Sequence, residues 1–114
     1  MTIIDIAAIP GRHIDRPGMT RTIKDLLVTK TMTTHLGIIP PGQSTSEHSH
    51  ASAEEIVYVV QGVGRCRVGG EAGELRANNL VFVPEGLPHQ YTNTGNENFV
   101  IFVVYSPPAD VPKQ

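Results

Sequence analysis

The stretch GQSTSEHSHASAEEIVYVVQG, from Gly42 to Gly62, decides what this 114-residue chain is expected to fold into. His48 and His50 lie one residue apart in it, and Glu55 follows after four more residues. Side chains at i and i+2 share a face of a β-strand, whereas a helix needs a spacing of three or four. The run IVYVV over residues 56–60 favours a strand, because β-branched and aromatic residues are enriched in strands. The pattern predicts two imidazoles on one strand face with a carboxylate nearby, which is a set of metal ligands.

A fourth candidate ligand, His89, lies in the turn-rich stretch PEGLPHQYTN over residues 84–93, which leads into a short strand. Three histidines and a glutamate suit a divalent transition metal, since magnesium and calcium prefer oxygen ligands. Iron, manganese, nickel, copper and zinc all accept imidazole, so the ligand types leave the choice among these ions open. We therefore expect one such ion per chain, held by His48, His50, Glu55 and His89.

These residues resemble the two sequence motifs of the cupin family. The stretch 42–62 matches the first motif in its two glycines, two histidines and one glutamate, and residues 84–93 have the form PxGxxHxxxN of the second. The second motif normally opens with a glycine six residues before its proline, and this chain has Asn78 there. The resemblance implies an all-β, double-stranded β-helix (jelly-roll) cupin barrel, with residues 1–114 as one domain.

The remainder of the chain is predicted to form short strands separated by turns. Residues 1–19 are expected to be an arm with turns at Pro10-Gly11 and Pro17-Gly18, and residues 106–114 a short tail. The strands expected between them are 20–30, 31–39, 56–60, 65–68, 74–77, 80–83, 89–92 and 99–105. No convincing 3.6-residue period appears, and this rhythm is typical of a β-sandwich or barrel.

Charge and composition bear on partners and compartment. The net charge is −2, with no basic patch and no apolar run of membrane-spanning length, so we expect neither a nucleic-acid partner nor a membrane. The N-terminal residues show no secretory signal, and the lone Cys66 allows no intrachain disulfide. Both features favour the cytoplasm. Cys66 is expected to be buried, with Arg65 and Arg67 on the opposite strand face.

Three functions are compatible with these residues. Four ligands leave positions of an octahedral ion for a substrate, and similar single-domain cupins include dioxygenases acting on diketone-like or catechol-like molecules. The leading hypothesis is therefore a dioxygenase-type oxidoreductase on a small oxygen-rich substrate, with Glu55 and Tyr91 as candidate catalytic residues. The alternatives are a non-redox isomerase or lyase of a sugar or uronate, and a binding or sensor protein without catalysis. His13 and His35 belong to no motif and are assigned no role.

The adjacent residues Glu54 and Glu55 can be told apart by register. Six residues separate Glu55 from Gly62, as the first motif requires, and neighbouring strand residues point to opposite faces. Glu55 is therefore expected inside the barrel and Glu54 outside. His50 and Glu55 are an odd number of residues apart, which predicts a bend or bulge within 49–53.

A homodimer is expected on two grounds. The strand 99–105 is apolar on both faces, so it is either covered on both sides within the domain or part of a dimer contact. The arm 1–19 has little core of its own and is easily ordered by a partner's sheet. Together these features favour a two-fold dimer.

Overall fold

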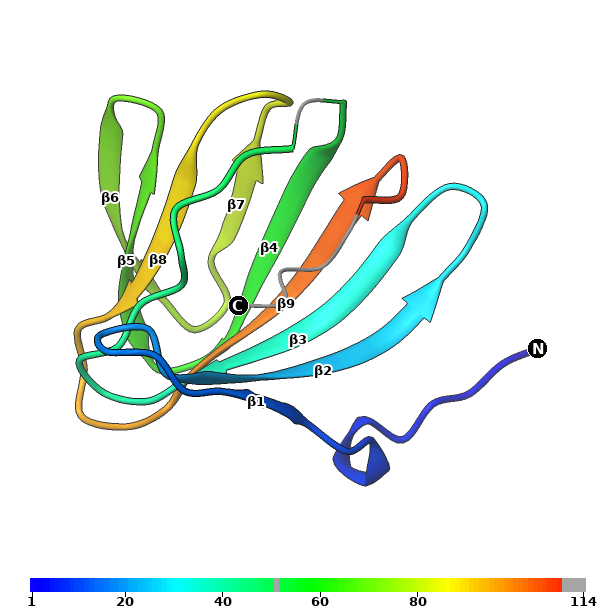
Figure 1. Cartoon of the computed structure of the whole chain (residues 1–114), viewed down its shortest axis with the longest axis horizontal. Helices are drawn as coiled ribbons and strands as arrows, with labels where there is room; N and C mark the ends of the chain where they lie inside the picture. Colours follow the sequence, from blue (N-terminus) through cyan, green and yellow to red (C-terminus); the bar gives the residue numbers. More distant parts are fainter. Residues whose placement is uncertain (51, 110–114) are drawn as a thin grey trace.

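The fold consists of two antiparallel β-sheets around a shared interior (Figure 1). The computed structural model describes residues 1–50 and 52–109. In chain order, its elements there are a short 3-10 turn and nine strands: η1 (Ile6–Ala8), β1 (Arg12–Ile14), β2 (Arg21–Val28), β3 (Thr33–Ile39), β4 (Glu54–Gln61), β5 (Val63–Val68), β6 (Glu71–Arg76), β7 (Leu80–Val83), β8 (His89–Asn93) and β9 (Phe99–Ser106).

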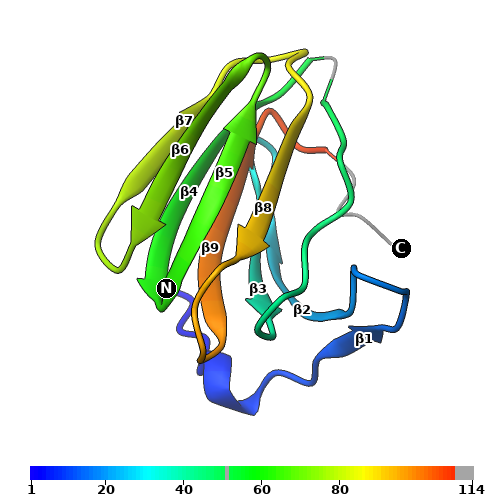
Figure 2. The ribbon, with the colours of Figure 1, turned by 90° about the vertical axis from the view of Figure 1, so that its left-hand side faces the viewer.

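The strand order identifies the architecture. One sheet has six strands in the order β1-β2-β3-β9-β4-β7, and the other has three in the order β6-β5-β8. Figure 2, turned by 90°, shows the three-stranded sheet in front of the larger one. The last strand, β9, lies between β3 and β4, so the chain returns to the middle of the sheet that it began. This confirms the all-β jelly-roll expected from the sequence. In the described part of the chain, no helix is long and apolar enough to cross a membrane.

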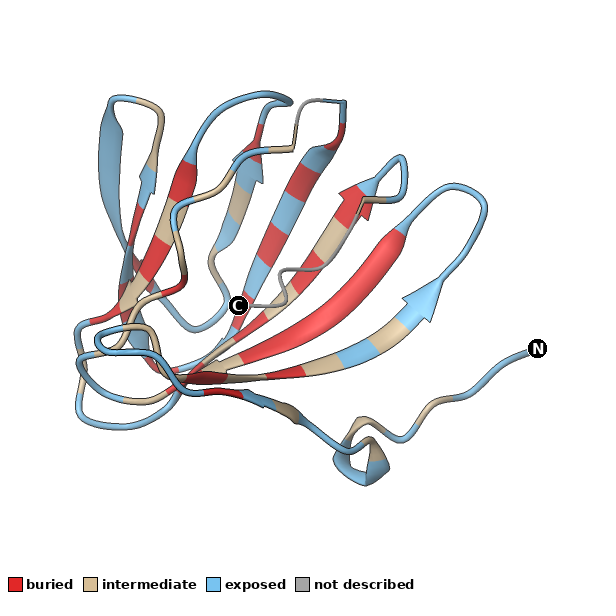
Figure 3. Ribbon diagram, in the orientation of Figure 1, coloured by how far each residue is buried: buried red, intermediate tan, exposed pale blue. Residues whose placement is uncertain are grey.

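Period-two alternation separates the interior from the outer surface (Figure 3). On β4, alternate residues from Glu55 to Val59 are buried, and the residues between them are exposed. On β9, alternate residues from Phe99 to Tyr105 are buried, and those between them are half-buried. Cys66 is buried between exposed Arg65 and Arg67, as expected. The core therefore lies between the two sheets, and on β4 and β9 it is lined by every second residue.

The segment 40–53 corrects one expectation. His48 and His50 do not lie on a regular strand: residues 40–50 run beside β8, and among the described residues they pair with it through isolated bridges, Ser44 with Thr92 and His48 with His89. The segment's proline, glycine and serine content, together with the odd spacing from His50 to Glu55, explains why no continuous ladder forms. The bend expected within 49–53 agrees with the irregular backbone there, although Ala51 lies outside the described residues.

The N-terminal arm is a second correction. Residues 12–14 form β1, which pairs with the start of β2 in the same chain, and Ile14 is buried. Arg12 also forms an ion pair with Asp25 on β2, with Nε 2.5 Å from Oδ2. Part of the arm is thus ordered by its own sheet. A three-residue strand between two Pro-Gly turns is too short for a period-two pattern to reveal.

Two turns explain why the motifs need particular residues. Gly62 has φ 90°, and a Cβ there would lie 2.6 Å from the carbonyl oxygen of Asn98, so only glycine fits. Asn78, which stands where the second cupin motif has glycine, adopts a left-handed φ of 74°. Asparagine tolerates this conformation better than most residues, and its Oδ1 also accepts a hydrogen bond from the Tyr58 hydroxyl. The departure from the motif therefore preserves the turn.

Gly64→Ala is expected to destabilise the fold by about 1–3 kcal/mol. A Cβ at this position in β5 would lie 2.5 Å from the ring of Phe99, which is fully buried and cannot move aside. Gly73→Ala, on the paired strand β6, is the matched control, because its Cβ would meet only the Cys66 sulfur at 3.9 Å. Denaturant unfolding of both variants checks the prediction. Equal free energies of unfolding for the two would contradict it.

Candidate metal centre

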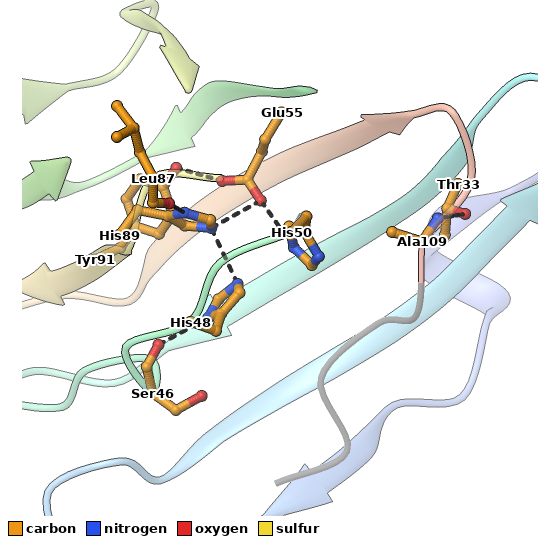
Figure 4. A network of polar contacts seen from close by, with 9 residues as sticks. All are labelled: Thr33, Ser46, His48, His50, Glu55, Leu87, His89, Tyr91 and Ala109. Atoms are coloured by element: carbon orange, nitrogen blue, oxygen red, sulfur yellow. Dashed lines mark hydrogen bonds and ion pairs between the residues drawn. The ribbon is translucent and has the colours of Figure 1, made fainter. Parts of the chain in front are cut away.

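Three separate segments bring the four expected ligands together (Figure 4). His48 and His50 come from the irregular segment, Glu55 is the second residue of β4, and His89 is the first residue of β8. Two backbone hydrogen bonds join His48 and His89, from each N–H to the other carbonyl, at 3.2 and 2.9 Å. This bridge fixes the two imidazoles side by side, so the local pairing of the chain is what assembles the cluster.

The ligand atoms converge on one point. The Nε2 atoms of His89 and His48 are 3.1 Å apart, and Glu55 Oε1 lies 3.3 Å from His89 Nε2 and 3.8 Å from His50 Nε2. One donor atom from each of the four residues lies within 4.8 Å of all the others. The sequence prediction that these four side chains meet is therefore confirmed, and the cluster could bind a metal ion.

Hydrogen bonds on the outer side of the rings fix which nitrogen faces the cluster. His48 Nδ1 donates to the carbonyl of Ser46 and His89 Nδ1 to the carbonyl of Leu87, each at 2.9 Å. In its neutral form each ring therefore presents a bare Nε2 lone pair to the centre. The Nε2 atoms of His48 and His89 are 3.1 Å apart, and two lone pairs at this distance repel each other unless a proton or a cation lies between them. His50 Nε2 is buried with no hydrogen-bond partner in the described part of the chain. These donor atoms fit a divalent transition metal.

The pKa shifts of the four residues favour a bound cation. Burial lowers the pKa of His48 and His50, because a charged imidazolium is disfavoured away from water. Burial also opposes charge on His89, but the hydrogen bond and charge of Glu55 outweigh it and raise the pKa of His89. Burial disfavours an ionised Glu55, yet hydrogen bonds and charge from its neighbours hold its pKa below the usual value. Metal binding should therefore compete with protonation of His89 as the pH falls.

Tyr91 holds the carboxylate in place. Its buried hydroxyl donates to Glu55 Oε2 at 2.5 Å, which leaves Oε1 directed at the three histidines. Burial raises the pKa of Tyr91 well above its usual value, and the charge of Glu55 adds to this, so the hydroxyl remains a donor. Glu54, in contrast, is exposed on the opposite face of β4, as its register predicts.

The cluster lies at the wall of an internal cavity of about 30 Å³. His48, Glu55 and Tyr91 form part of the wall, and much of the rest is apolar. Three further residues line it that sequence reasoning did not select: Arg21, His35 and Tyr105. The sequence contains only a weak signal for His35. It shares one face of β3 with Thr33, Gly37 and Ile39, which predicts that it faces inward but does not predict a role for it. His13, the other histidine outside the motifs, is exposed and contacts Thr22.

The chain belongs to the cupin family. A cupin-domain profile matches residues 35–105. The chain is 33% identical over 113 residues to the polyketide synthase CurC of Streptomyces cyaneus, covering 96% of this chain and 72% of that protein. Its fold is similar to that of a predicted oxalate decarboxylase from Thermotoga maritima, with a TM-score of 0.86 at 23% identity over 93% of this chain and 99% of that one. The protein TT1209 from Thermus thermophilus gives a TM-score of 0.80 at 26% identity, over 96% and 100% of the two chains.

His35 is expected to make the stability of the metal-free protein depend on pH. Burial lowers its pKa from 6.5 to about 4, so the fold favours the neutral ring. The unfolded chain takes up this proton first, and the stabilisation present above pH 6.5 is lost as the pH falls toward 4. Between pH 7 and 5 the loss is about 2 kcal/mol.

The variant His35→Leu removes this contribution. Its free energy of unfolding should fall by about 2 kcal/mol less than that of the wild type over the same pH interval. Denaturant unfolding with chelator present, at pH 7 and pH 5, measures the difference. The same pH dependence in both proteins would show that His35 is not held neutral by the fold.

Proposed function

We propose that this protein is a metal-dependent enzyme that acts on a small, oxygen-rich molecule, with dioxygenase-type oxidation as the first candidate reaction. The observation that carries the proposal is the position of the ligand cluster at the wall of a cavity, since a purely structural metal site would be closed on all sides. His48, His50, Glu55 and His89 would hold the ion. Bound there, a divalent transition metal supplies a Lewis acid that polarises substrate oxygens and, for redox-active ions, a route for electrons.

The chain's own residues have separate tasks in this proposal. Tyr91 is a positioning residue, because its hydroxyl reaches Glu55 Oε2 and fixes the carboxylate. Glu55, ionised and buried, is the group on the cavity wall that can accept a proton from the substrate. Ile39, Ile101 and Val103 form an apolar wall that limits water near the reacting atoms.

The size of the cavity and one relative indicate the kind of substrate. A volume of about 30 Å³ is far below that of a pocket for a large ligand, so only a compact molecule or one small portion of a larger one is enclosed. The relative CurC is named as a polyketide synthase. Polyketide chemistry produces carbonyls on alternate carbons, and such 1,3-dicarbonyl units are chelating ligands for metal ions. A 1,3-dicarbonyl compound is therefore the substrate type we propose.

A second candidate is a non-redox isomerase or lyase. It is favoured by the two proton acceptors on the cavity wall, Glu55 and the neutral imidazole of His35, because proton transfer within a substrate needs such groups. A polarised dicarbonyl loses a proton from its central carbon readily. In this case the ion's electrons take no part.

Oxygen consumption distinguishes the two reactions. Protein loaded separately with iron, manganese and zinc would be incubated with 1,3-dicarbonyl compounds, and oxygen uptake would be followed alongside substrate loss. The dioxygenase proposal expects uptake that matches substrate loss with a redox-active ion and none with zinc. Unchanged turnover without oxygen would select the non-redox reaction. Tight binding without turnover under either condition would make the protein a ligand-binding cupin.

A further inference from the structure

The cavity wall carries three further polar residues that are not among the four expected ligands, and one of them, Tyr105, packs against the ring of His50 with centroids 4.1 Å apart. His35 on β3, Arg21 on β2 and Tyr105 on β9 line the same cavity as His48 and Glu55. All three project from the inner face of the six-stranded sheet. None belongs to either sequence motif, and none contributes to the ligand cluster. Their presence in a small and largely apolar cavity needs an explanation.

His35 lacks a hydrogen-bond partner within the part of the chain that the structure describes. The residue is only 6% exposed, and its Nδ1 atom is fully buried without a partner. Its ring packs against the ring of Tyr105, with centroids 5.4 Å apart. Packing alone would not require a histidine here. An apolar side chain could fill the same space, and it would avoid the cost of a buried nitrogen without a hydrogen bond. A ligand atom in the cavity is the natural partner for this nitrogen.

Arg21 gives this region a positive charge. It is 2% exposed, and its Nη1 donates to the carbonyl of Met19 at 2.9 Å. Burial lowers its pKa, but a guanidinium stays charged at neutral pH. Burial and the charge of Glu55 raise the pKa of Tyr105, so its hydroxyl also remains a donor. Among the described residues on the cavity wall, Glu55 is the one acid, and it belongs to the metal cluster.

We propose that Arg21, His35 and Tyr105 bind the carboxylate of a small acid whose other oxygens face the metal cluster. The donors and the positive charge complement an anion, and the apolar residues that line the rest of the cavity suit a short carbon chain. This inference rests on the proposed function for the metal end of the cavity. It extends that function by making the substrate class a small 1,3-dicarbonyl acid instead of a neutral diketone.

Malonate and acetylacetone are the matched probes. Both carry oxygens on alternate carbons and have the same number of non-hydrogen atoms. Malonate is an anion with two carboxylates, whereas acetylacetone is neutral and has none. Calorimetric titration of each into zinc-loaded protein measures binding without turnover, since zinc is redox-inert. The wild type is expected to bind malonate at least about tenfold more tightly than acetylacetone, because hydrogen bonds to charged groups are the stronger ones.

Two variants locate the source of that preference. His35→Leu and Arg21→Met should each weaken malonate binding by about tenfold or more and leave acetylacetone binding within about twofold. His13→Leu, an exposed histidine on β1, is the control and should change neither. Zinc content, measured on every sample, should be the same in all of them. Circular dichroism shows whether the variants are folded.

The outcomes separate this inference from the proposed function. Zinc content tests the metal site alone, and a wild type that retained no zinc would refute the proposed function. Malonate titration of metal-free protein should still show weaker binding by His35→Leu than by the wild type, because His35 is not one of the four expected metal ligands. Equal malonate affinity in the wild type and both folded variants would overturn the inference. So would a wild type that binds acetylacetone as tightly as malonate, a result that needs no variant to fold.

Discussion

Glu55→Ala is expected to lower the affinity for a divalent transition metal by about tenfold or more, whereas Glu54→Ala should leave it within about twofold. The two residues are neighbours in the chain and have the same side chain, so they are matched for chemistry. Glu55 is buried, with Oε1 3.3 Å from His89 Nε2, and Glu54 is exposed on the other face of β4. The difference in metal affinity therefore arises from the pleat of one strand.

Titration of zinc against a competing chelator measures both affinities. Glu55→Gln should accompany Glu55→Ala, because the amide fills the same space and can still accept the hydrogen bond from Tyr91, but it carries no charge. Loss of affinity in both Glu55 variants would assign the effect to the carboxylate and not to a collapsed site. A larger loss in Glu54→Ala would mean that the register of β4 is wrong by one residue.

Phe82→Asp is expected to convert a two-fold homodimer into a monomer. The outer face of the six-stranded sheet carries a row of exposed apolar side chains on adjacent strands: Ile56, Tyr58 and Val60 on β4, with Leu80 and Phe82 on β7. Phe82 is directly opposite Ile56 in register and is 54% exposed, and Leu80, opposite Tyr58, is 66% exposed. A contiguous apolar face of this kind is typical of an interface, and we propose that a second copy of the chain covers it by a two-fold axis.

Light scattering at micromolar concentration checks the dimer. Placing a charge on this apolar face should weaken association by about thirtyfold or more. Val63→Asp, which introduces the same charge at an exposed valine of the other sheet, is the control and should remain dimeric. A wild type with the mass of a monomer would rule out the dimer, and a dimeric Phe82→Asp variant would place the interface elsewhere.

The four residues of the candidate metal centre could be predicted from the sequence because their spacing is tied to the backbone. Glu55 is fixed by its distance from Gly62, where a left-handed φ admits only glycine, and by the alternation of β4. His89 is fixed by its position after the Pro84–Gly86 turn and at the start of β8. Rules of this kind involve residues that are close together in the sequence, and each motif lies within one such stretch.

The other polar residues of the cavity wall could not be predicted in this way. Arg21, His35 and Tyr105 come from three strands that only the sheet topology brings together, and each is unremarkable within its own segment. The irregular path of residues 40–50 was also missed, because i and i+2 spacing suits a regular strand as well as an extended loop. Isolated bridges to β8 hold this segment, and a bridge depends on two distant stretches of the chain at once.

The most direct test of the account is the metal content of the protein together with its thermal stability. Protein purified without a histidine tag and dialysed after exposure to zinc should retain one ion per chain. At a hundred times its dissociation constant, a ligand that binds only the folded state stabilises it by about 2.7 kcal/mol, so chelation should lower the melting temperature. This stabilisation should fade below about pH 6, where protons compete for the imidazoles. His89→Ala should lose both the ion and the response to chelator. Identical melting curves with and without chelator for the wild type, and the same metal content in His89→Ala, would contradict a metal centre built from these four residues.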